Sequence, residues 1–232
     1  MMKLSTLLLP ALLFFGCVSN HTTPHSNAKD IIELSTEEGL KLLSESDQTQ
    51  YLKTKEFWEA QRKNYCGPCS VAVSANTLHQ KKTITQDNFF ERGVSKAVIK
   101  PEIVAKMGLT LREIHAATEH LLPTFRNRKF YAHLSGLDLF RTHLRELNKR
   151  KGFQLIVNFS RQSIAGAGMR SGHFSPAVAY NENTRQVLIL EVQSSRDSFW
   201  VSDKDLYTAM QAIDPVSRIP RGWLKITKEK DQ

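Results

Sequence analysis

A cysteine and a histidine about a hundred residues apart are the side chains of this sequence best suited to chemistry. Cys66 lies on a glycine-flanked turn, Asn-Tyr-Cys-Gly-Pro-Cys-Ser (residues 64–70), and His173 lies in Ser-Gly-His-Phe-Ser-Pro (residues 171–176). A helical pattern follows the cysteine over residues 71–78, and a helix N-terminus lowers the pKa of a nearby thiol. A distant histidine is the usual base for such a thiol. The pair predicts nucleophilic catalysis by a thiolate.

A carboxylate that could orient the imidazole follows eighteen residues after the histidine. Glu191 lies in the aliphatic run Val-Leu-Ile-Leu-Glu-Val (residues 187–192), whose composition is that of a strand. Cysteine, histidine and acid, in this order, is the chain order of papain-like enzymes. The acids further along are expected in a loop, which leaves Glu191 as the orienting group. They are Asp197, Asp203 and Asp205.

Around this triad the chain resembles the phytochelatin synthase family, and in particular its short bacterial members. The resemblance covers about residues 31–227 and rests on several separate motifs in the right order. They are Tyr65-Cys66-Gly67, Thr-Gln-Asp-Asn-Phe-Phe (residues 85–90), Lys96-Ala97-Val98-Ile99 with Pro101-Glu102, Gly172-His173-Phe174-Ser175-Pro176, Leu-Ile-Leu-Glu-Val (residues 188–192), Trp200-Val201 and Arg221-Gly222-Trp223. The resemblance implies an α+β, papain-like cysteine protease fold with an N-terminal helical part and a C-terminal antiparallel sheet.

The resemblance also implies a glutathione γ-glutamylcysteinyl transferase or hydrolase. Cys66 would attack the Cys–Gly peptide carbonyl and form a thioester. Water would then release γ-glutamylcysteine, or a second glutathione would accept the acyl group and give a phytochelatin. Since no Cys-rich segment of the plant type follows Arg221-Gly222-Trp223, we expect hydrolysis to exceed synthesis. The triad requires no metal cofactor, and heavy-metal ions would enter as thiolates of glutathione.

Four further residues take their expected roles from the same resemblance. Gln61 matches a glutamine that donates to the oxyanion, a contribution worth about 100-fold or more in rate. Arg221 and Asp214 match positions that hold the γ-glutamyl end of the substrate, where arginine grips an α-carboxylate and aspartate an α-ammonium. Gly172 is expected to line the same substrate site. A surface glutamine and a surface ion pair are the simpler alternatives.

The sequence departs from the family pattern at three places near the expected site. Glu191 stands where the family has aspartate, one methylene shorter, although glutamate can still accept from the imidazole. Gln61 precedes the cysteine by five residues instead of six, which could displace its amide. Ser194 stands where the family has arginine, and the Tyr-Pro-Pro stretch of the family is not found after it. Recognition of the acceptor substrate is therefore the least secure of the implied properties.

The second cysteine of the motif leaves alternatives open. Cys-Gly-Pro-Cys also occurs in thioredoxins, but there a buried strand leads into the motif, whereas residues 59–64 are polar. Cys69 is expected to be a small buried helix residue or a regulatory disulfide partner of Cys66, the latter if Cys66 lies in a non-helical turn. The alternative functions are an exported thiol-redox or metal-binding module using both cysteines, and a weakened glutathione-binding lipoprotein.

The N-terminal residues read as an export signal. A short positive start is followed by an apolar stretch over residues 4–15 and by Gly16-Cys17, which resembles a lipobox. We expect residues 1–17 to be a signal peptide with Cys17 lipidated, residues 18–30 a flexible tether, and residues 31–228 the catalytic domain. The protein would be a periplasmic, membrane-anchored lipoprotein of a bacterium; an ordinary cleaved signal is the alternative. His21 and His25 could form a metal site, but a disordered tether is the favoured interpretation of this segment.

Composition limits the remaining classes of function. The chain has 232 residues, 41% hydrophobic and 24% charged, as expected for one globular domain. Three cysteines make no disulfide framework. The net charge of +9 is spread along the chain without an interleaved aromatic patch, so no nucleic-acid partner is expected. A basic field would help to collect an anionic peptide such as glutathione, and a homodimer is a further expectation.

Hydrophobic spacing predicts the elements that must position these residues. A capping box at Ser35-Thr36-Glu37-Glu38 would open a short helix. Further helices are predicted over residues 71–78, 102–107, 111–120 and 137–148, with a helical or irregular segment over 51–61. Strands are predicted over residues 153–159, 175–180, 187–192 and 222–227, and turns at 80–82 and 181–183. Residues 85–94 are expected to form a loop with Phe89 and Phe90 packed inward.

Overall fold

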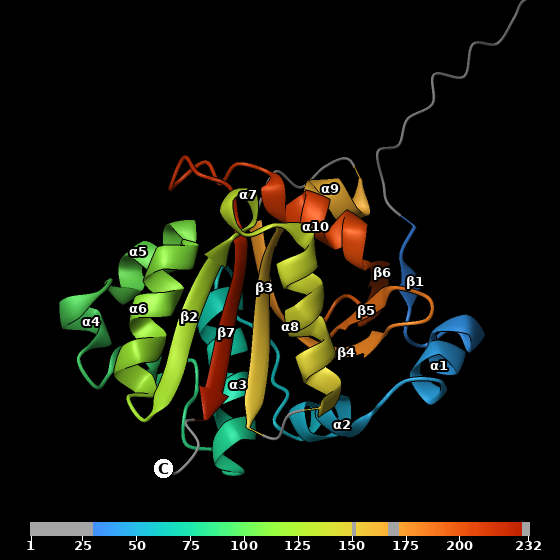
Figure 1. Cartoon of the computed structure of the whole chain (residues 1–232). Helices are drawn as coiled ribbons and strands as arrows, with labels where there is room; N and C mark the ends of the chain where they lie inside the picture. The colour runs from blue at the N-terminus through green and yellow to red at the C-terminus, as the bar shows by residue number, and fades with distance from the viewer. Residues whose placement is uncertain (1–29, 150–151, 167–171, 229–232) are drawn as a thin grey trace, which may run out of the picture.

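The computed structural model describes residues 30–149, 152–166 and 172–228, and within them one antiparallel sheet lies between two layers of helices (Figure 1). The strand order is β1-β6-β5-β4-β3-β7-β2. The strands are β1 (Ile32–Glu33), β2 (Phe125–Tyr131), β3 (Phe153–Ser160), β4 (Gly172–Asn181), β5 (Gln186–Ile189), β6 (Phe199–Ser202) and β7 (Gly222–Lys228). The helices are α1 (Glu37–Ser44), α2 (Thr49–Glu56), α3 (Cys66–His79), α4 (Val94–Ala97), α5 (Pro101–Met107), α6 (Leu111–Leu121), α7 (Ala132–Ser135), α8 (Leu137–Lys149), α9 (Arg161–Ala165) and α10 (Asp203–Gln211), with a 3-10 turn at Asn88–Phe90.

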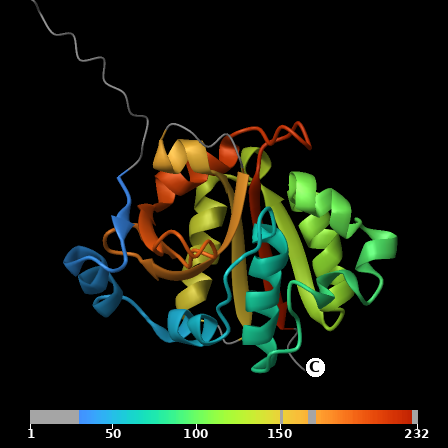
Figure 2. The same ribbon diagram turned by 180° about the vertical axis from the view of Figure 1, so that it is seen from behind.

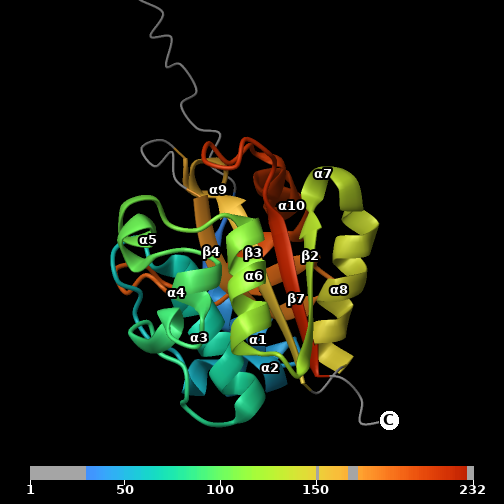
Figure 3. The same cartoon turned by 90° about the vertical axis from the view of Figure 1, so that its left-hand side faces the viewer.

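The two faces of the sheet bury different hydrophobic clusters. Helices α3 and α6 cover one face, and α8 and α10 cover the other, as Figure 3 shows edge-on. Side chains of β3 enter both clusters, for example Ile156 on the α3 side and Val157 on the α8 side. A strand covered on both faces carries a continuous apolar run, which is why residues 153–159 were legible as a strand. The predicted α+β class is confirmed.

Most of the predicted helices are present, and their caps explain their first residues. The Thr36 hydroxyl accepts from the Gly39 backbone N–H at 3.1 Å and caps α1. With Thr36 as the cap, the third helical position is Gly39, which has no side chain to bond back to the cap. The predicted capping box at α1 is therefore wrong. The reciprocal pair lies instead at α6, between Thr110 and Glu113. Phe89 and Phe90 are buried as predicted.

Five regular elements between residues 125 and 211 escaped the sequence-based prediction: β2, α7, α9, β6 and α10. Strand β2 is polar because it is an edge strand, paired with β7 alone. Strand β6 and helix α10 replace the expected loop. Asp203 begins α10 and is buried, where its carboxylate receives both Arg141 Nε and Nη2 at 2.9 Å and the Tyr180 hydroxyl at 2.8 Å. This acid is therefore a buried structural partner, not a loop residue.

The predicted signal peptide, most of the tether and Cys17 lie outside the described residues, as do His21 and His25. None of the helices in the described ranges combines the length and the apolar composition that a membrane span needs.

Candidate active site

Cys66 is the first residue of helix α3, which packs along the sheet (Figure 2). The sequence predicted a helix only from residue 71, with the cysteine on a turn before it, and this boundary is wrong. Pro68 is compatible with the longer helix because the first turn of a helix has no backbone acceptor for its N–H groups. Tyr65, the residue before the helix, gives no side-chain cap. The thiol therefore lies at the positive end of a 14-residue helix.

The thiol of Cys66 faces His173, which lies near the start of β4. Ser70, one turn further along α3, donates to the Phe174 carbonyl at 3.1 Å and ties the helix to this strand. Burial raises the pKa of the Cys66 thiol, but the hydrogen bond and the charge of His173 outweigh burial, so the pKa lies below its ordinary value. The thiol is thus set up to ionise.

Glu191 reaches His173 from the segment that follows β5. The strand ends at Ile189, three residues earlier than predicted, and a bulge interrupts its pairing with β4 between Ala177 and Ala179. A bulge turns the following side chains to a new direction. Glu191 Oε1 lies 2.7 Å from His173 Nε2 and also accepts the Gln193 backbone N–H at 2.8 Å.

The protonation states of this pair follow from its surroundings. His173 Nε2 is occupied by Glu191 and by the Ser175 hydroxyl at 2.8 Å, which leaves Nδ1 for the thiol. Burial lowers the pKa of His173, but the charge of Glu191 and the bonds to Cys66 and Glu191 raise it above its ordinary value. Burial raises the pKa of Glu191, yet His173 and Arg161 bring it down to about 2. The arrangement favours a thiolate, an imidazolium and a carboxylate.

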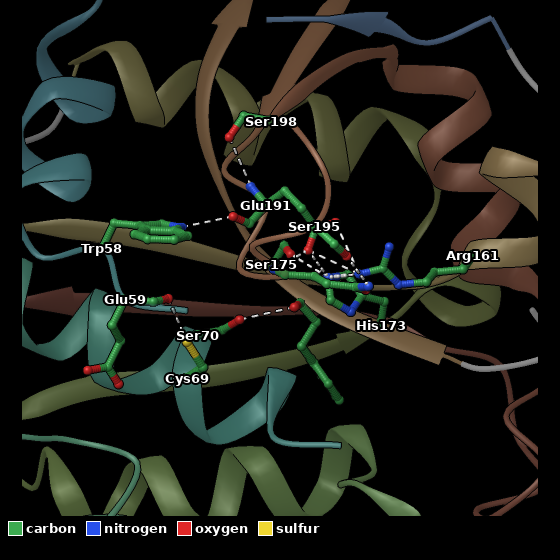
Figure 4. A network of polar contacts seen from close by, with 12 residues as sticks. Trp58, Glu59, Cys69, Ser70, Arg161, His173, Ser175, Glu191, Ser195 and Ser198 are labelled. Carbon is green, nitrogen blue, oxygen red and sulfur yellow. Dashed lines mark hydrogen bonds and ion pairs between the residues drawn. The ribbon is translucent and has the colours of Figure 1, made fainter. Parts of the chain in front are cut away.

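A buried arginine completes the group, and the sequence analysis missed it. Arg161 begins α9, and its Nη2 lies 2.7 Å from His173 Nε2 and 3.0 and 3.1 Å from the two oxygens of Glu191. Figure 4 shows the guanidinium beside the imidazole, with Trp58 and Ser198 bonded to the backbone of Glu191. The pairing of Phe159 with His173 brings the two strand ends together. Arg161 follows a predicted strand by two residues, which is the signal that could have found it.

Gln61 lies on a segment that is fixed from three sides. Its backbone N–H donates to the Val192 carbonyl at 2.8 Å, so the segment runs beside Glu191. The side chain of Gln86 donates to the Ala60 carbonyl at 2.9 Å and accepts the Arg62 N–H at 2.8 Å, bonding the residues on either side of Gln61. The Gln61 Oε1 is buried without a partner.

Cys69 is a buried helix residue, the simpler of its two expected roles. It is 0% exposed, and its Sγ lies 3.2 Å from the Glu59 carbonyl, to which it donates. Burial raises its pKa far above the ordinary value. Both cysteines are free thiols. The condition set for a regulatory disulfide with Cys66 is not met, because residues three apart in a helix have Cβ atoms about 5–6 Å apart, whereas a disulfide needs about 3.8 Å.

The residues before α3 also count against a thioredoxin-like module. The segment between α2 and α3 contains only turns and irregular backbone in the described residues, so no strand leads into the motif. Cys69 is also too buried to serve as an exchanging thiol.

Arg221 and Asp214 lie beside the histidine strand, but they are not a surface ion pair. Arg221 is 3% exposed and donates through Nη1 to the Ala212 and Ile213 carbonyls at 2.9 Å. Its Nη2 is 4.0 Å from Asp214, whose carboxylate also accepts from Ser217 Oγ at 2.8 Å. A Cβ on Gly172 would lie 2.7 Å from Arg221 Nε. Glycine at this position therefore lets the guanidinium approach the residue that precedes His173.

Comparisons with known proteins place the chain in a family. The family model described as phytochelatin synthase matches residues 23–223. The chain belongs to the phytochelatin synthase family. Glutathione gamma-glutamylcysteinyltransferase 2 of Arabidopsis thaliana is 25% identical over 71% of this chain and 36% of its own length. Glutathione gamma-glutamylcysteinyltransferase 3 of Lotus japonicus is 24% identical over 86% of this chain and 43% of its own length. The chain thus spans less than half the length of these relatives.

The comparison with solved structures returned the peptidase domain of Streptococcus ComA, a bi-functional ABC transporter involved in quorum sensing. It shares 16% identity, with a TM-score of 0.47, over 74% of this chain and 97% of that domain.

The structure gathers the residues predicted for catalysis in this phytochelatin synthase family member. Cys66, His173 and Glu191 form one connected group, and the Gln61 segment lies against the backbone next to Glu191. In the part of the chain that is described, no group of three or more His, Cys, Asp or Glu side chains is arranged to hold a metal ion. Cys17 is outside the described residues.

Proposed function

We propose that this protein cleaves the Cys–Gly bond of glutathione through a thioester on Cys66, mainly releasing glycine and γ-glutamylcysteine. The observation that carries the proposal is the buried chain of contacts from the Cys66 thiol through His173 to Glu191 in a member of this family. It supplies a nucleophile, a base and an orienting acid. The longer relatives are named glutathione gamma-glutamylcysteinyltransferases, and we propose the same substrate for this chain.

In the first half-reaction the thiolate of Cys66 attacks the carbonyl carbon of the Cys–Gly peptide. The carbonyl oxygen becomes an oxyanion, and the amide of Gln61 is the donor we assign to it. The Gln61 Oε1 is buried without a partner, and Nε2 is the atom we assign as the donor. His173 then transfers its Nδ1 proton to the nitrogen of the departing glycine, and the C–N bond breaks to leave the thioester.

In the second half-reaction neutral His173 takes a proton from water as the water attacks the thioester. The tetrahedral intermediate collapses, the C–S bond breaks, and γ-glutamylcysteine leaves with the thiolate restored. Glu191 holds the proton of Nε2 throughout, so that Nδ1 is the nitrogen that exchanges protons. In phytochelatin formation a second glutathione takes the place of water. Its α-amino group, as a neutral amine, attacks the thioester; its thiol does not.

Hydrolysis is the outcome we assign as dominant. The family has an arginine at the position of Ser194, and in this chain the arginine is displaced to Arg196, which weakens the expected recognition of the anionic acceptor. We assign Arg221 and Asp214 to the γ-glutamyl end of the donor substrate, because a guanidinium and a carboxylate complement the two charges of an α-amino acid. Glutathione bearing a heavy-metal ion on its thiol is a further donor form.

The deciding experiment incubates the protein with glutathione and measures free glycine, γ-glutamylcysteine and phytochelatin by mass spectrometry. Cys66→Ala should abolish glycine release, and Cys69→Ala should keep most of it in reductant. The two variants are matched because both remove one thiol from the same helix. Equal loss in both would contradict the assignment of Cys66 as the sole nucleophile. Phytochelatin in excess of γ-glutamylcysteine would contradict the dominance of hydrolysis.

We also propose that the protein is exported and anchored through a lipid on Cys17. The support is the sequence alone: an apolar stretch of signal-peptide length over residues 4–15 that ends at Gly16-Cys17. Intact mass of the membrane-associated protein, compared with that of Cys17→Ser, tests this. An unmodified N-terminus cleaved elsewhere would contradict it.

A further inference from the structure

Arg161 is a buried cation that touches the base of the reaction. Its side chain is 6% exposed, and one nitrogen, Nη2, makes all three short contacts: with His173 Nε2 at 2.7 Å and with the Glu191 oxygens at 3.0 and 3.1 Å. Arginine–carboxylate pairs are frequently bidentate, with two nitrogens donating to the two oxygens. Here a single nitrogen contacts both carboxylate oxygens, including Oε1, the atom that receives the imidazole proton.

The charges of the site balance only when Arg161 is included. A thiolate on Cys66, an imidazolium on His173 and a carboxylate on Glu191 carry one net negative charge in a buried place. Arg161 brings the sum to zero. Because an uncompensated charge in the interior is costly, the guanidinium stabilises the ionised form of the whole group.

In the described residues, further charged or titratable groups lie near Arg161 and the triad. They are Glu59 before α3, Cys69 on α3, Arg196 and Asp197 after β5, Glu33 on β1, and Asp214 with Arg221 before β7. Of these, Glu59 acts on Cys69, and Arg196 acts on Arg161. Arg221 and Asp214 form their own pair beside Gly172. Arg161 contacts His173 and Glu191 directly.

We propose that Arg161 is a positioning residue that acts as the counter-charge of the triad and sets the pH range in which Cys66 and His173 are both ionised. The physical argument is Coulombic. A cation near the thiolate stabilises it, and the same cation near the imidazolium disfavours it. Arg161 therefore moves both ionisations to lower pH, and its removal should move both to higher pH. Loss of packing alone would reduce the rate without moving both limbs in one direction.

The test measures alkylation of Cys66 by iodoacetamide against pH, without glutathione. The reagent is neutral, so removal of a cation does not change its attraction to the site. Tandem mass spectrometry of the peptide that carries both cysteines separates Cys66 from Cys69. In Arg161→Gln the midpoint for Cys66 should rise by about one pH unit, with about tenfold slower alkylation below the midpoint. Arg161→Lys, which keeps the charge, should return the midpoint most of the way to that of the parent.

A second readout is the pH profile of kcat/KM for glycine release, in which both limbs should move to higher pH in Arg161→Gln. Superimposable profiles of this variant and the parent would overturn the inference. So would failure of Arg161→Lys to restore the midpoint, since the charge would then not be the cause.

A third pair of variants covers the case in which Arg161→Gln does not fold. The double variant Arg161→Gln with Glu191→Gln removes both buried charges, and its Cys66 midpoint should lie above that of Glu191→Gln alone; an equal midpoint would overturn the inference. The inference rests on the proposed function only for the identity of the reaction. If the pH midpoint of Cys66 alkylation shifts as expected in the Arg161 variants but the parent releases no glycine, the proposed function is refuted and the role of Arg161 stands.

Discussion

Replacement of Glu191 by glutamine tests whether one carboxylate both orients the base and stabilises the fold. In the structure its side chain is fully buried and receives His173, Arg161 and the Gln193 backbone N–H. An amide of the same length keeps the shape of the side chain and removes its charge. The substitution therefore leaves Arg161 buried without a counter-ion and His173 without support for its imidazolium.

The size of both effects follows from the pKa of the carboxyl group. Its value of about 2 lies about 2.5 units below the ordinary 4.5, which corresponds to about 3 kcal/mol of interaction with the ionised form. The cost of breaking a buried ion pair is of the same order, about 3–5 kcal/mol. For a domain of this size about 3 kcal/mol lowers the Tm by roughly 6–12 °C. The same free energy, if lost from the transition state, slows glycine release by about 300-fold.

The assay pairs a thermal melt with the rate of glycine release for Glu191→Gln and Glu191→Asp. The aspartate variant keeps the charge and restores the residue of the family, so it should retain appreciable activity. A lower Tm with an unchanged rate would show that Glu191 serves only as the partner of Arg161. A glutamine variant equal to the parent in both measurements would refute the reasoning, because the carboxylate would then neither orient His173 nor balance a buried charge.

Two further predictions concern residues outside the triad. Gln86→Ala should release the backbone on both sides of Gln61 and lower kcat by about tenfold, part of the loss that removal of an oxyanion donor brings. Steady-state kinetics check this against the control Asn88→Ala, because the Asn88 side chain bonds only its own loop. Equal kcat in the two variants would contradict the prediction. His143 accepts the Trp223 indole N–H at 3.0 Å, and burial lowers its pKa to about 4, so it is neutral in the fold. The unfolded chain binds this proton more tightly; stability should therefore be complete above about pH 6.5 and decline by up to about 3 kcal/mol as pH falls toward 4. Urea unfolding against pH should show this decline in the parent and a flatter curve in His143→Gln, and parallel curves would contradict the assignment.

The sequence determined the order of the reacting residues and most of the elements that carry them. The apolar run of β3 and the helical spacing of α6 and α8 were legible because local periodicity reports which face of an element is buried. The family motifs around Cys66 and His173 identified the nucleophile and the base. The presence of glutamate at position 191, where the family has aspartate, was visible as well, although its consequence was not.

Tertiary structure decided the start of α3, the direction of Glu191 and the presence of Arg161. A helix boundary at a proline depends on whether the first N–H groups need partners, and local sequence does not show this. Glu191 points at the imidazole because the chain leaves strand β5 after Ile189, next to the bulge in β4. Arg161 meets His173 because antiparallel register places the end of β3 opposite the start of β4. Register, bulges and buried charge balance are properties of segments far apart in the chain, and for this reason only the folded molecule shows them.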